Sequence, residues 1–169
     1  MITFRAKNPS HNLTPPTTSP AQLDDIGGRL VDLNIAGCAL GNLRESDILF
    51  NLQRCPKLER IDLSVYLGGI GAAEGAALGT SCPKLSHVCL SRSKRLSYLG
   101  IAELARKLPE LRSFDVSSSA TCDLEECGVI LRALGAHNHK LEHLNVSCVL
   151  FYVLLTIVLY GCPVFTAPR

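Results

Sequence analysis

A short apolar phrase with the pattern L-x-x-L-x-L recurs along this chain of 169 residues, with Ile, Val or Phe replacing some of the leucines. Its copies begin at Leu30, Leu58, Leu85, Leu111 and Leu141, so the interval between them stays between 26 and 30 residues. Repetition of such a phrase at this spacing is typical of stacked units that each supply one short strand. The period constrains the fold more than any other feature of the sequence, because units of this kind form one parallel sheet.

The segments between the phrases have helical periodicity, and a helix breaker follows each of them. Four apolar sets are expected to face inward: Ile48, Leu49 and Leu52; Ala72, Ala73, Ala76, Ala77 and Leu78; Ile101, Leu104, Ala105 and Leu108; Val129, Ile130, Leu131 and Leu134. A shorter helix is expected from Ser19-Pro20 to Gly27-Gly28. The predicted fold class is therefore α/β, a leucine-rich-repeat solenoid of about five strand–loop–helix repeats with a concave parallel sheet.

The two ends of the chain differ from the predicted repeat domain, residues 19–148. Residues 1–18 are rich in Pro, Thr and Ser, and such a segment buries too little apolar surface to offset its ordering entropy. We therefore expect a disordered leader there. Residues 149–169 are mostly apolar, and three interpretations stay open: a cap on the last repeat, a C-terminal membrane anchor formed by residues 149–165, or a truncated repeat.

The expected location is the cytoplasm or nucleus, because no signal peptide is recognisable. The anchor interpretation would instead place the chain at a membrane. Mitochondrial import is a further alternative, since the leader has Arg5 and Lys7 and no acidic residue before Asp24. A net charge of +2 and an aromatic content of 5% give no reason to expect a nucleic-acid partner.

Eight cysteines raise the question of disulfides or a metal site. Cys55 and Cys82 each open a Cys-Pro-Lys-Leu phrase, one repeat apart, and the sequence has no C-x-x-C pair. Cysteines at equivalent positions of stacked repeats are most simply small buried side chains at the ends of helices. We predict structural thiols in a reducing compartment, with disulfides or a metal site as alternatives.

No group of residues in the sequence indicates catalysis, and no cofactor is expected. Residues 67–75 are rich in glycine before an alanine-rich helix, but Glu74 stands where the dinucleotide-binding fingerprint requires its third glycine. Asp62 and Asp115 fall on strands two apart, about 10 Å from each other at the usual strand spacing. That distance is wide for a pair of catalytic carboxylates. The chain is predicted not to be an enzyme.

Side chains alternate between the two faces of a strand, so the residues between the repeat leucines are expected on the concave face. They form three columns of mostly short polar side chains. We predict that a protein partner contacts this face, while the basic loop 91–95 is an alternative contact. The predicted partner-binding residues are Asp32, Asn34, Arg60, Asp62, Ser64, His87, Cys89, Ser91, Ser113, Asp115, Ser117, His143 and Asn145.

The phrase C-P-K-L-x-x-[IV]-x-L-S, present at residues 55–64 and 82–91, resembles the cysteine-containing leucine-rich repeats of F-box/LRR proteins. Residues 30–38, which end in Gly37-Cys38, are similar to the strand phrase of that family. The third and fourth repeats depart from it, with serine-rich residues 91–93 and 117–119 in place of the Gly-Cys end.

The resemblance implies a non-catalytic protein–protein interaction module, a substrate-recognition adaptor in a cullin-type ubiquitin ligase pathway. The leader is too short and too polar to be an F-box, so another chain or a longer isoform would supply the contact with the ligase. The alternative function is a membrane-tethered leucine-rich-repeat scaffold or assembly factor, held by residues 149–165.

Overall fold

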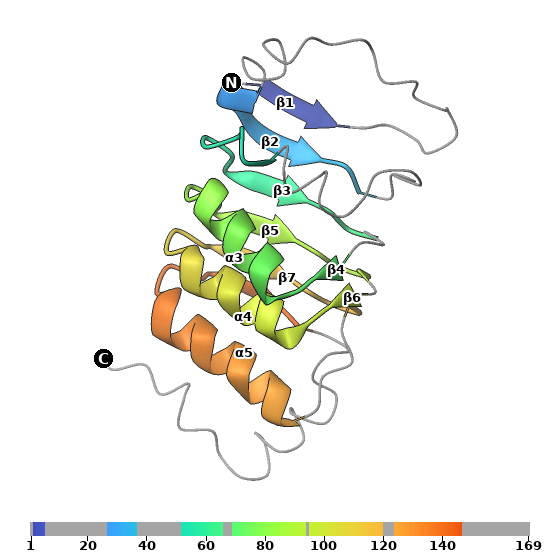
Figure 1. The fold of residues 1–169 in the computed structure, drawn as a ribbon, viewed down its shortest axis with the longest axis vertical. Helices are drawn as coiled ribbons and strands as arrows, with labels where there is room; N and C mark the ends of the chain where they lie inside the picture. Colours follow the sequence, from blue (N-terminus) through green and yellow to red (C-terminus); the bar gives the residue numbers. More distant parts are fainter. Residues whose placement is uncertain are drawn as a thin grey trace.

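The described part of the chain forms two layers, a sheet and a row of helices (Figure 1). The computed structural model describes residues 2–5, 27–36, 52–65, 69–93, 95–119 and 124–146. Expectations for residues 6–26, for Ile48 and Leu49, and for residues 149–169 lie outside these ranges.

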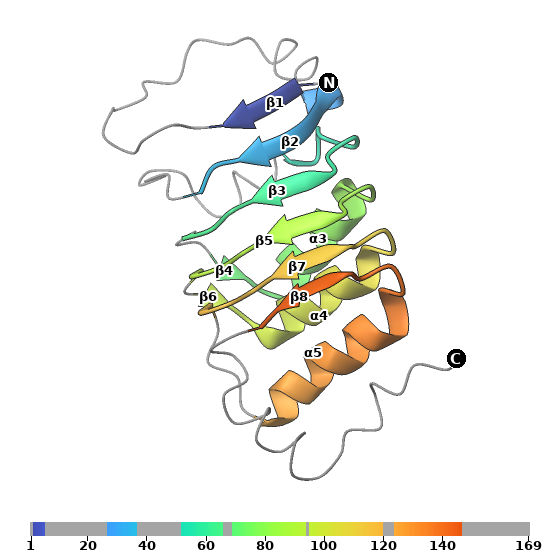
Figure 2. The same ribbon diagram turned by 180° about the vertical axis from the view of Figure 1, so that it is seen from behind.

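A six-stranded parallel sheet forms the first layer, and its strands follow one another in chain order (Figure 2). Its strands are β1 (Ile2–Arg5), β2 (Leu30–Asn34), β3 (Arg60–Asp62), β5 (His87–Cys89), β7 (Ser113–Asp115) and β8 (His143–Asn145). The last five lie within the five repeated phrases, as predicted. The predicted α/β class with a parallel sheet is therefore confirmed.

Strand β1 differs from the expectation of a disordered leader over residues 1–18. It pairs in parallel with β2, from Ile2 beside Leu30 to Arg5 beside Asn34. The average composition of the leader predicts disorder, although Ile, Thr and Phe within β1 favour extended structure. Pairing with β1 also occupies the edge that β2 would otherwise leave open.

The repeated apolar phrase forms the core between the two layers. Its first leucine is fully buried at Leu58, Leu85 and Leu111. The second and third apolar positions are at most 2% exposed in the same three units, at Ile61, Leu63, Val88, Leu90, Phe114 and Val116. The residues between them point to the other face of the sheet, which confirms the predicted alternation.

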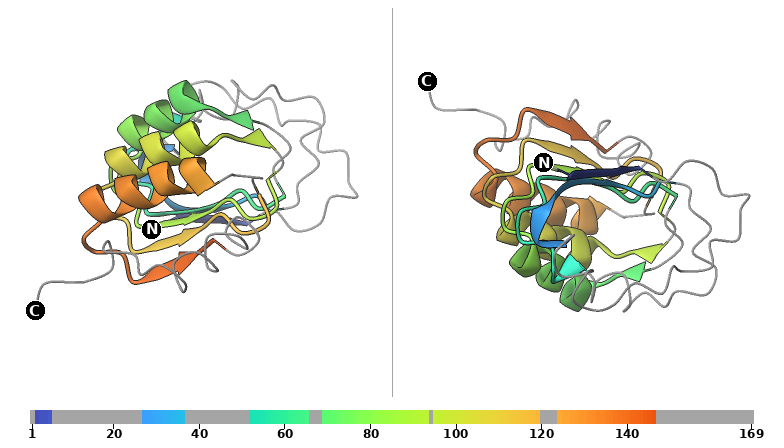
Figure 3. Two further views of the ribbon diagram at one scale, coloured as in Figure 1. Left: turned by 90° about the horizontal axis from the view of Figure 1, so that it is seen from below. Right: turned by 90° about the horizontal axis from the view of Figure 1, so that it is seen from above.

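Three described helices lie side by side on one face of the sheet (Figure 3). They are α3 (Ala72–Ser81), α4 (Tyr98–Lys107) and α5 (Leu124–His137). The predicted inward set of α4 is confirmed, since all four of its residues are fully buried. In α5, Ile130 and Leu134 are buried, whereas Val129 and Leu131 stay partly exposed.

The predicted inward face of α3 is confirmed at Leu78 and wrong for the alanines. Its buried residues are Gly75, Leu78 and Gly79, while Ala72 and Ala73 are exposed. The reason is a very close approach of α3 to α4. A Cβ atom on Gly75 would lie 2.2 Å from the carbonyl oxygen of Gly100, so even an alanine would be too large at this contact.

A second, two-stranded parallel sheet was not predicted. It consists of β4 (Gly69–Ile70) and β6 (Arg95–Leu96), each of which leads directly into a helix. The hydroxyl of Ser97 accepts a hydrogen bond from the Gly100 amide at 3.0 Å and caps α4. Residues 27–29 are also helical, so the predicted helix end at Gly27-Gly28 is wrong. The rest of that predicted helix lies outside the described residues.

The turn after three of the strands contains a residue in the left-handed backbone region. These residues are Val65 (φ 64°), Arg92 (φ 58°) and Ser118 (φ 56°). In the repeat alignment they match Gly37 of the first phrase. The next residue in two of these turns is a buried serine, whose hydroxyl donates to a core carbonyl: Ser93 to Leu63 and Ser119 to Leu90.

We expect Val65→Gly to raise the free energy of unfolding by about 0.5–1 kcal/mol. A left-handed conformation costs an L-residue about 1–2 kcal/mol, which exceeds the entropic cost of about 0.5–1 kcal/mol that glycine adds. Val65 is 43% exposed, so little packing is lost. Urea unfolding measures the change, and Val65→Ala is the control, because alanine keeps the backbone penalty. Equal stability of the two variants would show that the turn is not strained at Val65.

Candidate functional site

The strand register places the predicted partner-binding residues in columns across the sheet. The first column contains Asp32, Arg60, His87, Ser113 and His143, and the second contains Asn34, Asp62, Cys89, Asp115 and Asn145. Ser64, Ser91 and Ser117 follow the strand ends. None of these thirteen residues is buried, and they are called the sheet face below. The helices lie on the opposite side of the sheet (Figure 3).

The second column is held by hydrogen bonds between adjacent units. Asn34 Nδ2 donates to Asp62 Oδ2 at 3.2 Å, and Asn145 Nδ2 donates to Asp115 Oδ2 at 3.1 Å. The other oxygen of each aspartate accepts a backbone N–H two residues later, from Ser64 or Ser117, at 2.9 Å. Both carboxylates therefore fix the turns at the strand ends. Sequence spacing alone could not show this use of the aspartates.

Cys89 interrupts this column with a partly exposed thiol. Its Sγ lies 3.0 Å from Ser64 Oγ and 3.7 Å from Ser91 Oγ, and Ser91 Oγ donates to Ser64 Oγ at 3.0 Å. The two serines belong to adjacent units. The group forms a small polar cluster in the middle of the sheet face.

The other described cysteines are buried, which agrees with the prediction for Cys55 and Cys82. Cys82 is the C-cap residue of α3, and its thiol donates to the Leu52 carbonyl at 3.4 Å. Burial, with a smaller contribution from Cys55, raises the pKa of the Cys82 thiol to about 12. Such a thiol is unreactive at neutral pH. Among the described residues, no group of three His, Cys, Asp or Glu side chains could hold a metal ion.

The first column carries charges of both signs. Arg60 Nη1 lies 3.9 Å from Asp32 Oδ2. Ser86 Oγ lies 2.9 Å from His87 Nδ1.

A shallow hollow of about 290 Å³ lies over strands β2 to β7. It is lined by Asp32, Arg60, Ile61, Asp62, His87, Val88, Cys89, Ser113 and Asp115. An open, shallow hollow of this kind fits a protein surface or peptide better than a small molecule, which typically binds in an enclosed pocket.

His87 is expected to make the fold less stable in mild acid. Burial lowers its pKa most, and Arg60, Arg112 and, least of all, His143 lower it further, whereas Glu142 raises it. Above the unfolded-state pKa of about 6.5 both states are neutral at this residue. As the pH falls below that value, the unfolded chain takes up the proton more readily, so stability is lost.

Urea midpoints at pH 7.5 and 5.5 test this expectation. The midpoint of the His87→Gln variant should fall less between the two pH values than that of the wild-type chain. His139→Gln, at an exposed position outside the sheet face, is the control and should keep the wild-type pH response. An unchanged response in His87→Gln would show that His87 does not contribute to acid sensitivity.

The structure also places two other regions that the sequence analysis considered, the glycine-rich segment and the basic loop. In the glycine-rich segment, the Glu74 carboxylate accepts the Gly71 amide hydrogen at 3.0 Å and so caps α3. In the alternative contact loop, Arg92 is exposed and Ser93 is buried, while Lys94 lies outside the described residues.

Comparison with protein-family models found no match to the chain, and comparison with curated proteins found none. Within the described residues, no helix is long and apolar enough to cross a membrane. The segment 149–165, named above as a candidate anchor, is not among those residues.

Proposed function

We propose that this chain is a leucine-rich-repeat protein whose parallel sheet forms the concave side of a solenoid, and that the sheet face binds a protein partner. The repeat period, the chain order of the strands and the row of helices on the other side support the proposed fold. The observation that carries the binding role is the pair of polar columns, which stay in register across five strands and remain accessible to solvent.

The chemistry of the sheet face favours a protein over a nucleic acid. Adjacent strands lie about 4.8 Å apart, so five strands offer an accessible row of roughly 19 Å. Arginine, histidine and aspartate side chains alternate along it, whereas nucleic-acid affinity depends mainly on uncompensated basic groups. Arg60, His87 and His143 are the largest side chains on this face, and we assign them the main contacts with the partner.

The resemblance to F-box/LRR repeats extends the proposal to a substrate-recognition adaptor in a cullin-type ubiquitin ligase pathway. The burial of Cys55 and Cys82 at equivalent positions supports the repeat assignment on which that resemblance depends. The contact with the ligase would come from another chain or a longer isoform. A membrane-tethered scaffold is the second candidate, favoured by the absence of charged residues between Leu144 and Pro168.

Affinity purification of the tagged full chain, with quantitative mass spectrometry, tests the proposed function. The sheet-face variant combines Arg60→Glu, His87→Glu and Ser113→Arg. The control combines Arg106→Glu and Arg132→Glu, at exposed positions of the helical layer. We expect one or a few proteins to co-purify with the wild-type chain and the control, and to be lost at least about tenfold with the sheet-face variant, as for removal of hot-spot contacts.

The identity of the co-purifying proteins separates the two candidates. Cullin-ligase subunits among them support the adaptor, whereas integral membrane proteins without a ligase subunit support the scaffold. Retention of the same partners by a folded sheet-face variant, checked by circular dichroism, would overturn binding through the sheet face.

A further inference from the structure

The last described unit leaves core positions partly exposed that are buried in the three units before it. Leu141, Leu144 and Val146 are partly exposed. Their equivalents one unit earlier, Leu111, Phe114 and Val116, are at most 1% exposed, because β8 and α5 cover them. No described element covers the far side of β8 and α5. The apolar interior of the stack is therefore open at this end.

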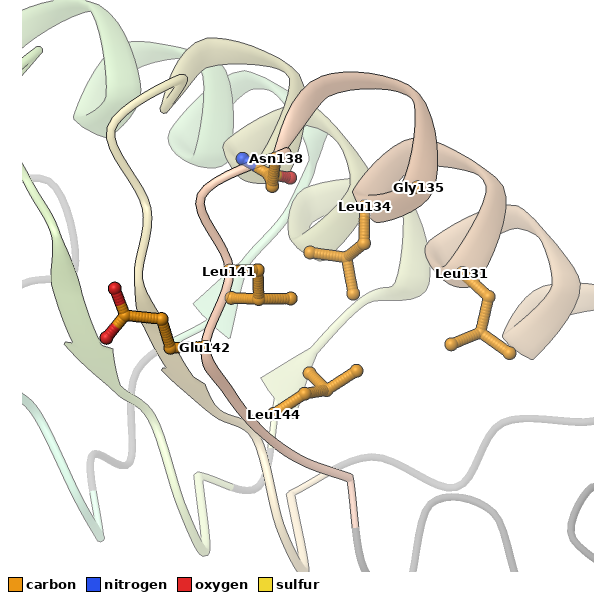
Figure 4. Close-up of a pocket in the computed structure, with 7 residues that line it drawn as sticks. All are labelled: Leu131, Leu134, Gly135, Asn138, Leu141, Glu142 and Leu144. Atoms are coloured by element: carbon orange, nitrogen blue, oxygen red, sulfur yellow. The ribbon is translucent and has the colours of Figure 1, made fainter. Parts of the chain in front are cut away.

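The open end forms a groove of about 290 Å³ between α5 and the chain leading into β8 (Figure 4). Leu131 and Leu134 extend into it from α5, and Leu141 and Leu144 from the opposite wall. Gly135, Asn138 and Glu142 also line it, and Glu142 is the only charged side chain among the described residues of the groove. An apolar surface of this kind gains free energy when another apolar segment covers it.

The chain itself supplies a segment of matching chemistry. Residues 149–160 read Val-Leu-Phe-Tyr-Val-Leu-Leu-Thr-Ile-Val-Leu-Tyr, and no charged residue occurs between Leu144 and Pro168. Strand β8 ends at Asn145, and the four residue steps to Val149 span at most about 14 Å of extended chain. The segment therefore begins within reach of the groove.

We propose that residues 149–160 fold back onto this groove and close the apolar end of the stack. The tether decides between this segment and a second copy of the chain. A segment joined by a short linker is present at an effective concentration in the millimolar range, which a separate molecule does not reach under ordinary conditions. The segment covers the apolar side of the last described unit, as a cap does at the end of a repeat stack.

Thermal unfolding of four full-length variants tests the proposal. The groove variant is Leu131→Lys, the segment variant combines Leu154→Lys and Leu155→Lys, and the third variant combines both sets. The control is Leu99→Lys, on α4, where the leucine is 45% exposed and outside the groove. We expect the groove variant and the segment variant each to lower Tm by about 4 °C or more. A shift of this size is expected when a small domain loses one stabilising contact.

The combined variant decides the result, because the two sets act through one contact. The Tm of the combined variant should lie within about 1 °C of the Tm of the less stable single variant, since additivity fails for residues in contact. The control should stay within about 1 °C of wild type, as expected for an exposed site. Additive losses in the combined variant, or a segment variant as stable as wild type, would overturn the proposal.

Two further measurements identify other occupants of the groove. Sedimentation at two protein concentrations would reveal a dimer, and its dissociation by Leu131→Lys would assign the groove to a second copy. Flotation with phosphatidylcholine vesicles that is lost only in the segment variant would assign residues 149–160 to a membrane. Either outcome overturns the proposed closure.

Discussion

Gly100→Ala is expected to lower the free energy of unfolding by about 3 kcal/mol, at the upper end of the range for overpacking a core. A Cβ atom at this position would lie 2.2 Å from the Ile70 carbonyl oxygen and 2.7 Å from that of Gly71. Both atoms belong to the backbone that leads into α3, so no side chain can rotate away. The helices α3 and α4 would have to separate. Urea unfolding followed by circular dichroism measures the loss.

Gly128→Ala is the matched control, because it makes the same change in a helix without close backbone contact. The nearest atom to a Cβ there is Arg132 Nη1 at 3.3 Å, at the end of a flexible side chain. Alanine is the better helix former by up to about 1 kcal/mol, so this variant should be as stable as wild type or more so. Equal stability of the Gly100→Ala and Gly128→Ala variants would contradict the close packing of α3 on α4.

Asn138→Ala is expected to lower the free energy of unfolding by about 2 kcal/mol. Asn138 is 4% exposed, and its Nδ2 donates to the carbonyl oxygens of Ala105 at 3.0 Å and of Leu108 at 2.7 Å. The substitution removes two buried hydrogen bonds at the end of α4, each worth about 0.5–1.5 kcal/mol net. Both carbonyls keep a backbone donor, the amides of Leu108 and Leu111, so neither is left unsatisfied. Asn145→Ala is the control at an exposed position, with an expected loss below about 1 kcal/mol. Urea unfolding at pH 7 compares the two variants.

Asn138→Asp separates the hydrogen bonds from the volume of the side chain. A carboxylate facing two carbonyl oxygens would be more destabilising at pH 7 than alanine, because a buried charge would have no donor. Burial raises the pKa of such a carboxyl group. The deficit should therefore shrink as the pH falls through that raised pKa, since the protonated group can donate one hydrogen bond. A deficit that is independent of pH would contradict the donor role of Asn138.

The strands could be predicted because the same apolar phrase supplies the buried strand positions in each unit. Leu58, Leu85 and Leu111 occupy the same buried position, and the alternation along each strand then fixes which residues reach the sheet face. The columns of the sheet face were predictable for this reason. The roles of Asp62 and Asp115 were not, because they depend on backbone amides that the turns bring within hydrogen-bonding distance.

Other features were hidden because they depend on the distance between units. In the sequence, the alanines of α3 resemble an apolar helix face. The neighbouring helix lies so close, however, that position 75 accepts only a glycine. The left-handed conformation of Val65 cannot be predicted from its residue type, because a β-branched residue is among the least suited to it. Only the alignment with Gly37 indicates it. Strand β1 was missed because the surrounding proline-rich composition outweighs three residues with strand propensity, Ile2, Thr3 and Phe4.

The chain order of the sheet has a consequence for folding and for evolution. Each strand from β2 to β8 pairs with the strand about one repeat away along the chain, so no unit requires the closure of a long loop. In the proposed solenoid, folding can start in any unit and spread to both sides, as in a one-dimensional array. Duplication or deletion of one unit would disturb pairing at a single junction. The sheet face can therefore lengthen or shorten in steps of one strand, about 4.8 Å each, while the remaining columns stay in register.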